Sequence, residues 1–262
     1  MAGPIGAQAA PGRLKQSAAR WCYRDIPLPV LCRGLRDLGL PAIDLLTPEE
    51  WPVAGDHGLV CSMGYGGGGT IEAGLNDRSL HDKIVRALEQ SLPKAAAAGV
   101  PNVIAFFGNR QGRSDDEGAD ACIECLQRIK PLAEQTGVTV CVELLNSKVN
   151  HPDYQGDRTG FGVRVMEGVG SSRIRLLYDI YHMQIMEGDV IRTIQQHHAL
   201  IAHYHTGGVP GRHELDDSQE LNWHAISRAI ADTGFKGFFA HEFIPTRDPM
   251  TSLREAVETC TV

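Results

Sequence analysis

Four residues of types that bind metals each stand at the end of a short apolar run: Glu143, Asp179, His205 and Glu242. The runs are VTVCVE (138–143), IRLLYD (174–179), LIAHYH (200–205) and GFFAHE (237–242). Successive members of this set are 36, 26 and 37 residues apart, about one strand-plus-helix unit each. Side chains delivered once per unit to the same end of a parallel sheet converge in space. The sequence therefore predicts that these four residues hold one metal ion.

Three carboxylates and one imidazole form a hard, oxygen-rich ligand set. Such a set favours Mn²⁺ or Mg²⁺, with Co²⁺ and Zn²⁺ as further alternatives. A divalent ion that chelates a carbonyl and the adjacent hydroxyl acidifies the carbon-bound proton between them. Glu143 and Glu242 come from different strands and would reach such a proton from different sides. We therefore predict that these two glutamates are the acid and base that move it.

Two polar residues near this set are predicted to bind substrate. His182 follows Asp179 by three residues, in a segment expected to leave the strand as a loop. Arg212 lies in a glycine-rich loop and suits a substrate carboxylate or phosphate, because guanidinium groups form bidentate pairs with such anions. A solvated loop arginine is the alternative for this residue. His213 and Glu214 are further candidates in the same loop.

Two aromatic residues are also predicted to contact substrate. Tyr65 lies in MGYGGGGTIEAGLND (63–77), which lacks the GKS or GKT of a phosphate loop and is predicted to be a mobile loop over the site. Trp21 is expected to form an apolar wall, with ordinary packing as the alternative. His203 precedes His205 by two residues, so on a strand both side chains face the same way. We expect His203 to be a core histidine that orients a ligand.

The elements that would position these residues alternate regularly along the chain. Eight apolar runs cover residues 15–21, 41–46, 58–63, 102–107, 138–143, 174–179, 200–205 and 237–242. Amphipathic stretches such as 28–40, 80–99 and 221–234 lie between them, and Gly39, Gly99, Gly137 and Gly234 mark expected helix ends. This alternation predicts a single (β/α)8 TIM barrel over residues 14–262, with the active site at the C-terminal ends of the strands. A doubly wound open sheet is the alternative.

Length and composition narrow the functional classes. A chain of 262 residues suits one barrel, and its net charge of −7 provides no basic surface for a nucleic acid or an anionic membrane. Seven cysteines without a disulfide framework indicate a reducing, cytoplasmic compartment, and the CxxC at Cys122 and Cys125 is expected to be ordinary helix. Residues 1–13 are predicted to be a poorly ordered segment and no signal peptide. We expect a small-molecule substrate and leave the oligomeric state, a homo-oligomer included, open.

Five segments together resemble a known superfamily. They are KQSAARWCY (15–23), VELLN (142–146), YDIYHMQ (178–184), HYHTGGVPGRHELDDSQELNW (203–223) and HEFIPT (241–246). The chain resembles the xylose isomerase-like TIM-barrel superfamily of sugar isomerases and epimerases, and within it the hydroxypyruvate isomerase family. The resemblance implies metal ligation by the positions matching Glu143, Asp179, His205 and Glu242. It also implies that the two glutamates are the acid and base, with His182 and Arg212 near the substrate.

The resemblance leaves the substrate open. Hydroxypyruvate isomerases often have Gln at the position of His205, whereas ketose 3-epimerases have His there. The leading expectation is a metal-dependent isomerase of a small hydroxy-carbonyl acid or sugar, acting through an enediolate. A ketose 3-epimerase or a 2-oxo-tetronate isomerase is the close alternative. An endonuclease IV-like metal phosphodiesterase is the alternative of a different class, and the net charge of −7 argues against it.

Overall fold

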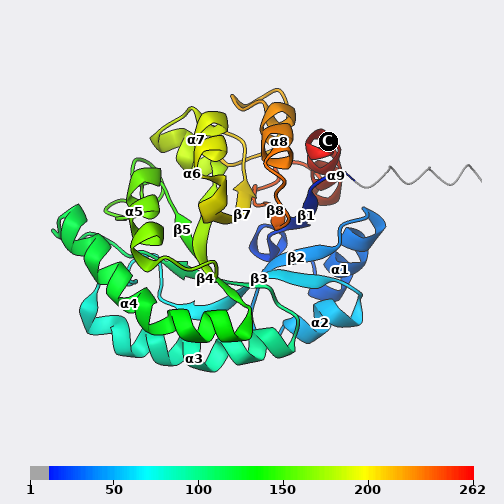
Figure 1. Ribbon diagram of the computed structural model, residues 1–262. Coiled ribbons are helices and arrows are strands. Elements are labelled where there is room, and N and C mark those ends of the chain that lie inside the picture. The colour runs from blue at the N-terminus through cyan, green and yellow to red at the C-terminus, as the bar shows by residue number, and fades with distance from the viewer. Residues whose placement is uncertain (1–11) are drawn as a thin grey trace, which may run out of the picture.

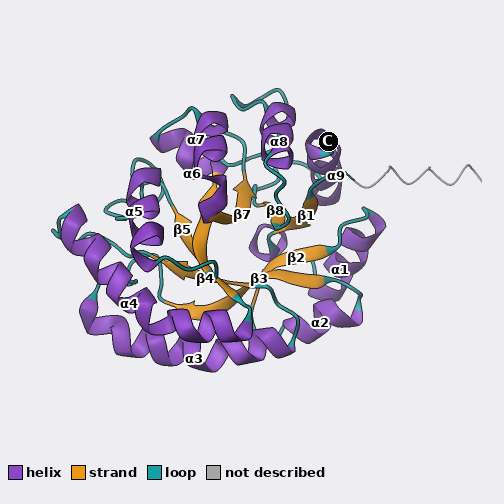
Figure 2. Ribbon diagram, in the orientation of Figure 1, coloured by secondary structure: helices purple, strands orange, loops and turns teal. Residues whose placement is uncertain are grey.

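Eight parallel strands form the centre of the computed structural model, which describes residues 12–262 (Figures 1 and 2). The strands are β1 (Lys15–Ala18), β2 (Ala42–Leu46), β3 (Val60–Gly68), β4 (Asn102–Phe106), β5 (Thr139–Leu144), β6 (Ile174–Asp179), β7 (Ile201–Thr206) and β8 (Phe238–His241). Neighbours pair in the order β1-β8-β7-β6-β5-β4-β3-β2. Between β1 and β2 the described chain has one isolated bridge, Ala19 to Asp44. The predicted (β/α)8 barrel is therefore confirmed, nearly closed, with a seam between β1 and β2.

Helices surround the strands on the outside, as Figure 2 shows. They are α1 (Leu28–Asp37), α2 (Trp51–Asp56), α3 (His81–Ala97), α4 (Asp115–Thr136), α5 (Thr159–Val169), α6 (Ile180–Met186), α7 (Val190–His197), α8 (Trp223–Asp232) and α9 (Pro249–Cys260), with short 3-10 turns at Arg20–Tyr23, Arg78–Leu80 and His198–Leu200. No helix among the described residues is both long and apolar enough to cross a membrane.

Local sequence explains where the helices begin and end. Ser114 caps α4 by accepting the backbone N–H of Glu117, whose carboxylate returns to the N–H of Ser114, so two unpaired helix donors are satisfied. At the other end, Gly137 adopts a φ of 74°, a left-handed conformation that ends a helix at little cost for glycine. Gly39, Gly99 and Gly234 also have positive φ values, as expected of predicted helix ends.

The barrel interior has its own small apolar layer. Its members come from successive strands or their ends: Ala19, Leu45, Met63, Ile104, Cys141 and Leu177, all buried. The larger core lies between the strands and the helices, where α3 and α4 bury their apolar faces. This apolar layer fills the barrel interior next to the polar side chains at the strand ends.

Several predicted boundaries were wrong. β1 ends at Ala18, and the chain turns into the 3-10 segment Arg20–Tyr23, so Trp21 lies beyond the strand. β3 runs on through the glycines to Gly68, so the first part of the predicted mobile loop 63–77 is strand, which the small glycines allow because a Cβ at Gly68 would meet the backbone of Ala105. β8 ends at His241, one residue before Glu242.

Two other predictions concern the amino terminus and the cysteines. The predicted poorly ordered segment 1–13 falls mostly on residues 1–11, which lie outside the described residues; within it, the side chain of Arg13 pairs with Asp232 at 2.8 Å. Cys122 and Cys125 are buried on α4 with free thiols, as expected of ordinary helix residues.

Candidate metal and substrate site

The four predicted metal ligands meet at the carboxyl ends of β5 to β8. The Nδ1 atom of His205 lies 2.6 Å from Oε2 of Glu242 and 3.2 Å from Oε1 of Glu143. Oδ2 of Asp179 lies 3.9 Å from the same nitrogen. Each residue offers one ligand atom, these atoms all lie within 4.8 Å of one another, and all four side chains are buried. Residues separated by up to 99 positions thus form one compact group, as parallel-strand geometry demands.

Electrostatics in this group favour a bound cation. Burial alone would lower the pKa of His205, but the adjacent carboxylates, with Glu242 first among them, raise it well above its usual range. Burial raises the pKa of Glu143 and of Asp179, and the charge of Glu242 adds to both shifts. Burial would also raise the pKa of Glu242, but the charges of Arg212 and His205 lower it instead. Burial raises the pKa values of Glu143 and Asp179, whereas attraction between opposite charges raises that of His205 and lowers that of Glu242.

Arg212 reaches into the group from the loop after β7. Its Nη2 donates to Oδ2 of Asp179 at 2.8 Å and to Oε2 of Glu242 at 2.5 Å, while Nε donates to the backbone oxygen of Glu242 at 3.0 Å. The guanidinium lies against the rings of Trp21 and Tyr181, at 5.4 and 5.0 Å. Arg212 has a φ of 60°, a conformation rare outside glycine and common at functional positions. It is therefore a built part of the site, and the alternative of a solvated loop arginine is wrong.

His182 lies on α6 and not in a loop as predicted, because Asp179 caps the helix by accepting the His182 N–H at 3.1 Å. The backbone N–H of Asn146 donates to Nδ1 of His182 at 3.1 Å. The pKa of His182 is lowered well below its usual value by burial and by Arg212, so the ring is neutral. Nη1 of Arg212 lies 2.9 Å from Nε2 of His182, with its N–H directed at that nitrogen. Arg212 therefore connects His182 with Asp179 and Glu242.

The two aromatic candidates flank the carboxylates differently. Trp21 donates from Nε1 to Oε1 of Glu242 at 2.5 Å, so this side chain orients a predicted ligand as well as offering an apolar face. Tyr65 on β3 is 38% exposed. Partial burial and the charges of Glu242 and Glu143 raise the pKa of Tyr65 to about 12, so its hydroxyl is neutral near pH 7 and available as a donor.

Sequence reasoning missed Asp44. This carboxylate on β2 is 0% exposed and accepts hydrogen bonds from Nε2 of His205 at 2.9 Å and from Nε2 of His203 at 3.2 Å. His203 was expected to orient a ligand, but it contacts Asp44 and packs its ring against that of His205 at 5.2 Å. The signal for Asp44 was available, because an acidic residue inside the apolar run AIDLL has no ordinary place in a buried strand.

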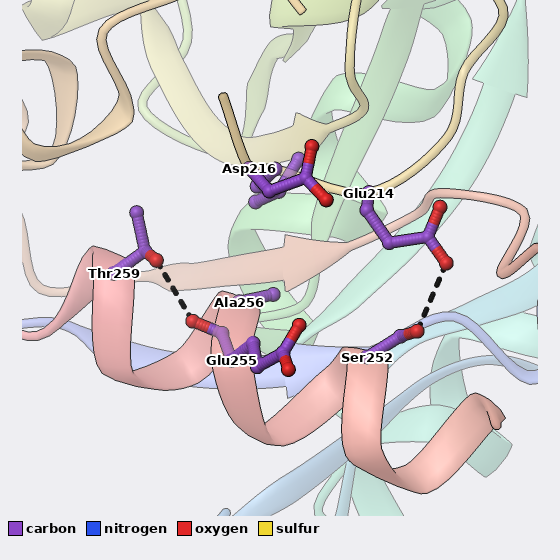
Figure 3. Close-up of a pocket in the computed structure, with 7 residues that line it drawn as sticks. Glu214, Asp216, Ser252, Glu255, Ala256 and Thr259 are labelled. Atoms are coloured by element: carbon purple, nitrogen blue, oxygen red, sulfur yellow. Dashed lines mark hydrogen bonds between the residues drawn. The ribbon is translucent and has the colours of Figure 1, made fainter. Parts of the chain in front are cut away.

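Glu214 and His213 lie outside this group. Glu214 accepts the backbone N–H of Thr246 at 2.7 Å and the hydroxyl of Ser252 at 2.9 Å, and so joins the loop after β7 to the start of α9 (Figure 3). Beside it is a small cavity lined also by Asp216, Glu255 and Thr259. His213 is hydrogen-bonded to the backbone oxygen of Ile244 at 3.0 Å. Both contacts are those of loop-stabilising residues.

Comparison with known proteins identifies a family and several relatives of this chain. A protein family described as "Xylose isomerase-like TIM barrel" matches residues 51–261. A Homo sapiens protein named "putative hydroxypyruvate isomerase" is 26% identical over 238 residues, covering 89% of this chain and 80% of that protein. The 2-oxo-tetronate isomerase of Cupriavidus necator is 34% identical over 199 residues, covering 76% of this chain and 70% of that protein. The D-psicose 3-epimerase of Agrobacterium fabrum is 25% identical over 197 residues, covering 70% and 64%.

Solved structures share the fold. The crystal structure of a family 2 AP endonuclease from Brucella melitensis superposes with a TM-score of 0.80 at 22% identity, covering 92% of this chain and 97% of that one. Such identity establishes the barrel and not the reaction. The family match and the sequence relatives go further. The chain belongs to the xylose isomerase-like TIM-barrel family, and it is an isomerase.

Proposed function

We propose that this chain is a metal-dependent isomerase of small hydroxy-carbonyl acids or sugars, similar to hydroxypyruvate isomerase. The observation that carries the proposal is the convergence of Glu143, Asp179, His205 and Glu242, whose ligand atoms lie within 4.8 Å of one another at the barrel mouth. Relatives named hydroxypyruvate isomerase and 2-oxo-tetronate isomerase support the reaction class.

The donor set fits a divalent cation. Three carboxylate oxygens and one imidazole nitrogen suit Mn²⁺ or Mg²⁺, with Co²⁺ and Zn²⁺ as alternatives. When His205 is neutral and all three carboxylates are ionised, Arg212 offsets only one of the negative charges, and a dication would offset the other two. Bound there, the ion supplies Lewis-acid polarisation of the substrate oxygens next to the migrating proton.

The proton transfer is assigned to Glu143 and Glu242. One glutamate removes the proton from the carbon beside the carbonyl, and an enediolate forms on the substrate. The other glutamate delivers a proton to the former carbonyl carbon, and the hydroxyl proton passes to the former carbonyl oxygen, which completes an isomerisation. Return of a proton to the opposite face of the original carbon would give an epimer instead. The two groups enter from β5 and from the end of β8, so their carboxylates approach a substrate from different strands.

Substrate binding is assigned to His182, Arg212, Trp21 and Tyr65. Nε2 of His182 and Nη1 of Arg212 lie 2.9 Å apart, and one substrate oxygen beside this pair would contact both groups. An oxygen of a carboxylate or a hydroxyl group meets this requirement. Trp21 and Tyr65 then bound the substrate on the side of β1 and β3.

Two related substrate classes have specific support. A 2-oxo-tetronate is favoured by the relative at 34% identity. A free ketose, epimerised at C3, is favoured by histidine at position 205 and by the D-psicose 3-epimerase relative. A phosphodiesterase of the endonuclease IV type is disfavoured, because the two metal-type groups of the described residues share His205 and the net charge is −7.

The test is a Mn²⁺-supplemented screen of hydroxypyruvate, 2-oxo-tetronates and free ketoses in deuterium oxide. We expect turnover of one class with solvent deuterium in the product, as proton transfer through an enediolate requires. Turnover without deuterium would replace the proton transfer with a hydride shift. Undiminished turnover after EDTA dialysis, with no metal in the protein by elemental analysis, would refute the metal assignment.

A further inference from the structure

Asp44 is a buried carboxylate that contacts His205, a proposed metal ligand, at the ring nitrogen that faces away from Glu143 and Glu242. It lies on β2, across the barrel from β7, and accepts Nε2–H of His205 at 2.9 Å, Nε2–H of His203 at 3.2 Å and the hydroxyl of Ser62 at 2.5 Å. We infer that Asp44 is the positioning residue of the metal site, because it fixes the proton of His205 on Nε2 and leaves Nδ1 free to bind the ion. This inference rests on the proposed metal-dependent function.

The backbone of β2 is irregular at Asp44 and Leu45. Pairing with β3 shifts register on both sides of Asp44, which is the mark of a β-bulge. Leu45, the next residue, has a φ of 57°, an uncommon left-handed conformation for a leucine in a strand. In a regular strand successive side chains face opposite sides, but the Leu45 side chain also belongs to the apolar layer inside the barrel. Strain of this kind persists where a function requires it.

The proton position follows from hydrogen-bond chemistry. An ionised carboxylate accepts and never donates, so each group that contacts Asp44 must bring its own hydrogen. Three groups surround the Asp44 carboxylate at hydrogen-bond distance, namely Nε2 of His203, Nε2 of His205 and the hydroxyl of Ser62, which is the environment of an ionised carboxylate that accepts from each of them. Nε2 of His205 therefore carries a proton in every state of the ring that keeps this contact. Nδ1, on the other edge of the ring, faces Glu242 and Glu143.

His203 holds the arrangement from the side. Its Nε2 contacts the same carboxylate, and its ring lies at 85° to the ring of His205, with centroids 5.2 Å apart. Its other nitrogen, Nδ1, is buried without a hydrogen-bond partner among the described residues. A buried polar atom without a partner costs free energy, so this histidine is poorly explained as core packing alone. Its contacts with Asp44 and His205 would hold these two side chains in place.

The cluster of Asp44, His203 and His205 is better explained by hydrogen bonds than by a second cation. An ion bound to Nε2 of His205 would need the lone pair at that nitrogen, while the proposed metal needs the lone pair at Nδ1. One neutral imidazole has only one lone pair to give. Ser62 already donates to Asp44, so three donors satisfy the carboxylate without an ion.

The variant Asp44→Asn tests this inference. An amide carries no charge and has one acceptor oxygen in place of two, so it holds the Nε2 proton of His205 more weakly than the carboxylate does, and His205 is free to move its proton to Nδ1. Mn²⁺ titrations by calorimetry and by electron paramagnetic resonance should show affinity lowered by about 10–100-fold, the usual effect of removing such an orienting partner. Circular dichroism and thermal melting establish that the variant is folded.

Two matched variants act as controls. Ser62→Ala removes a hydrogen bond from the same carboxylate without touching either ring, and Glu214→Gln removes a buried carboxylate whose hydrogen-bond partners are Thr246, Arg247 and Ser252 and none of the proposed ligands. Both should bind Mn²⁺ within about threefold of the parent, a smaller change than the loss of about 10–100-fold expected for Asp44→Asn. If Ser62→Ala loses as much affinity as Asp44→Asn, general disruption of β2 explains the loss and the inference is wrong.

A spectroscopic measurement separates this inference from the proposed function. In ¹⁵N-histidine-labelled protein, His205 should show a protonated, hydrogen-bonded Nε2 in the parent and lose this signal in Asp44→Asn; a His205→Gln variant assigns it. If the parent binds no divalent ion but this signal behaves as expected, the metal function fails and the role of Asp44 stands. If the parent binds Mn²⁺ and Asp44→Asn retains both its affinity and the Nε2 proton, the role of Asp44 is refuted while the metal function stands.

Discussion

Two sets of carboxylates are equally buried in this barrel but differ in their partners. Glu143 and Glu242 are 5% and 4% exposed at the mouth, and Glu214 is 4% exposed beside α9. Glu214 accepts two backbone N–H groups and two hydroxyls, from Thr246, Arg247 and Ser252. Glu143 has only His205 as a side-chain partner among the described residues. Burial alone therefore does not mark a site; the mouth differs because Glu143, Asp179 and Glu242 converge on one imidazole.

The largest difference between the two sets should appear in catalysis. Glu242→Gln and Glu143→Gln should each lower the rate of deuterium incorporation by about 10²–10⁴-fold, because each removes a proton-transferring group. Glu214→Gln should leave this rate near that of the parent. The proposed difference between the two sets is wrong if folded Glu143→Gln or Glu242→Gln keeps the full rate. It is also wrong if Glu214→Gln loses activity to the same degree.

The next effect is stabilisation by the ion. At a Mn²⁺ concentration 100 times its Kd, the folded state should gain about 2.7 kcal/mol, which raises the melting temperature by several degrees. Asp179→Asn should abolish this shift, because it removes one of the proposed ligands, whereas Glu214→Gln should retain it. Differential scanning calorimetry with and without Mn²⁺ gives the answer. An equal shift in both variants would mean that Mn²⁺ binds elsewhere.

The variant Arg212→Lys tests whether Arg212 binds the substrate. Lysine keeps the positive charge but cannot contact Asp179, Glu242 and His182 at the same time. Loss of one charge-assisted hydrogen bond to substrate costs about 1.5–3 kcal/mol, so kcat/KM should fall by roughly 10–100-fold, mainly through KM. Steady-state kinetics measure this effect. Unchanged kinetics would remove Arg212 from substrate binding.

The smallest effect concerns Glu214 and depends on pH. Burial would raise the pKa of Glu214, but the hydrogen bonds it accepts lower it to about 2 from 4.5. The folded pKa is depressed, so this stabilisation is complete above pH 4.5 and is lost as the pH falls toward 2. Glu214→Gln should lower the free energy of unfolding at pH 7 by about 1–2 kcal/mol, and the difference from the parent should shrink at pH 3. Urea titrations at both pH values test the sign; a larger difference at pH 3 would contradict it.

Much of this architecture is readable from the sequence, because strands of a parallel barrel are continuous apolar runs. The run 174–179 matches β6 at both ends, and the four ligand candidates at the ends of such runs do converge. Periodicity failed where glycine is involved, since Gly64 to Gly68 are strand despite a composition typical of loops. It also placed His182 in a loop, because the cap formed by Asp179 on a short helix was not recognised.

The role of Asp44 was beyond a pattern-based reading for a different reason. Simple alternation along β2 gives no indication that two successive side chains face inward, because a bulge depends on pairing with β3 and not on local residue types. Whether Arg212 faces solvent or the carboxylates is similarly set by its loop, where Gly211 and Arg212 both have positive φ values.

The single bridge between Ala19 and Asp44 joins the first and second strands where the barrel closes. The residue that completes the ring of strands is thus the one that orients His205. Closure of the barrel and the contact that orients His205 therefore depend on the same residue. A form of the chain with this seam open and Asp44 displaced would lack that contact. Hydrogen exchange at the amides flanking this seam would report how often the finished enzyme revisits that open form.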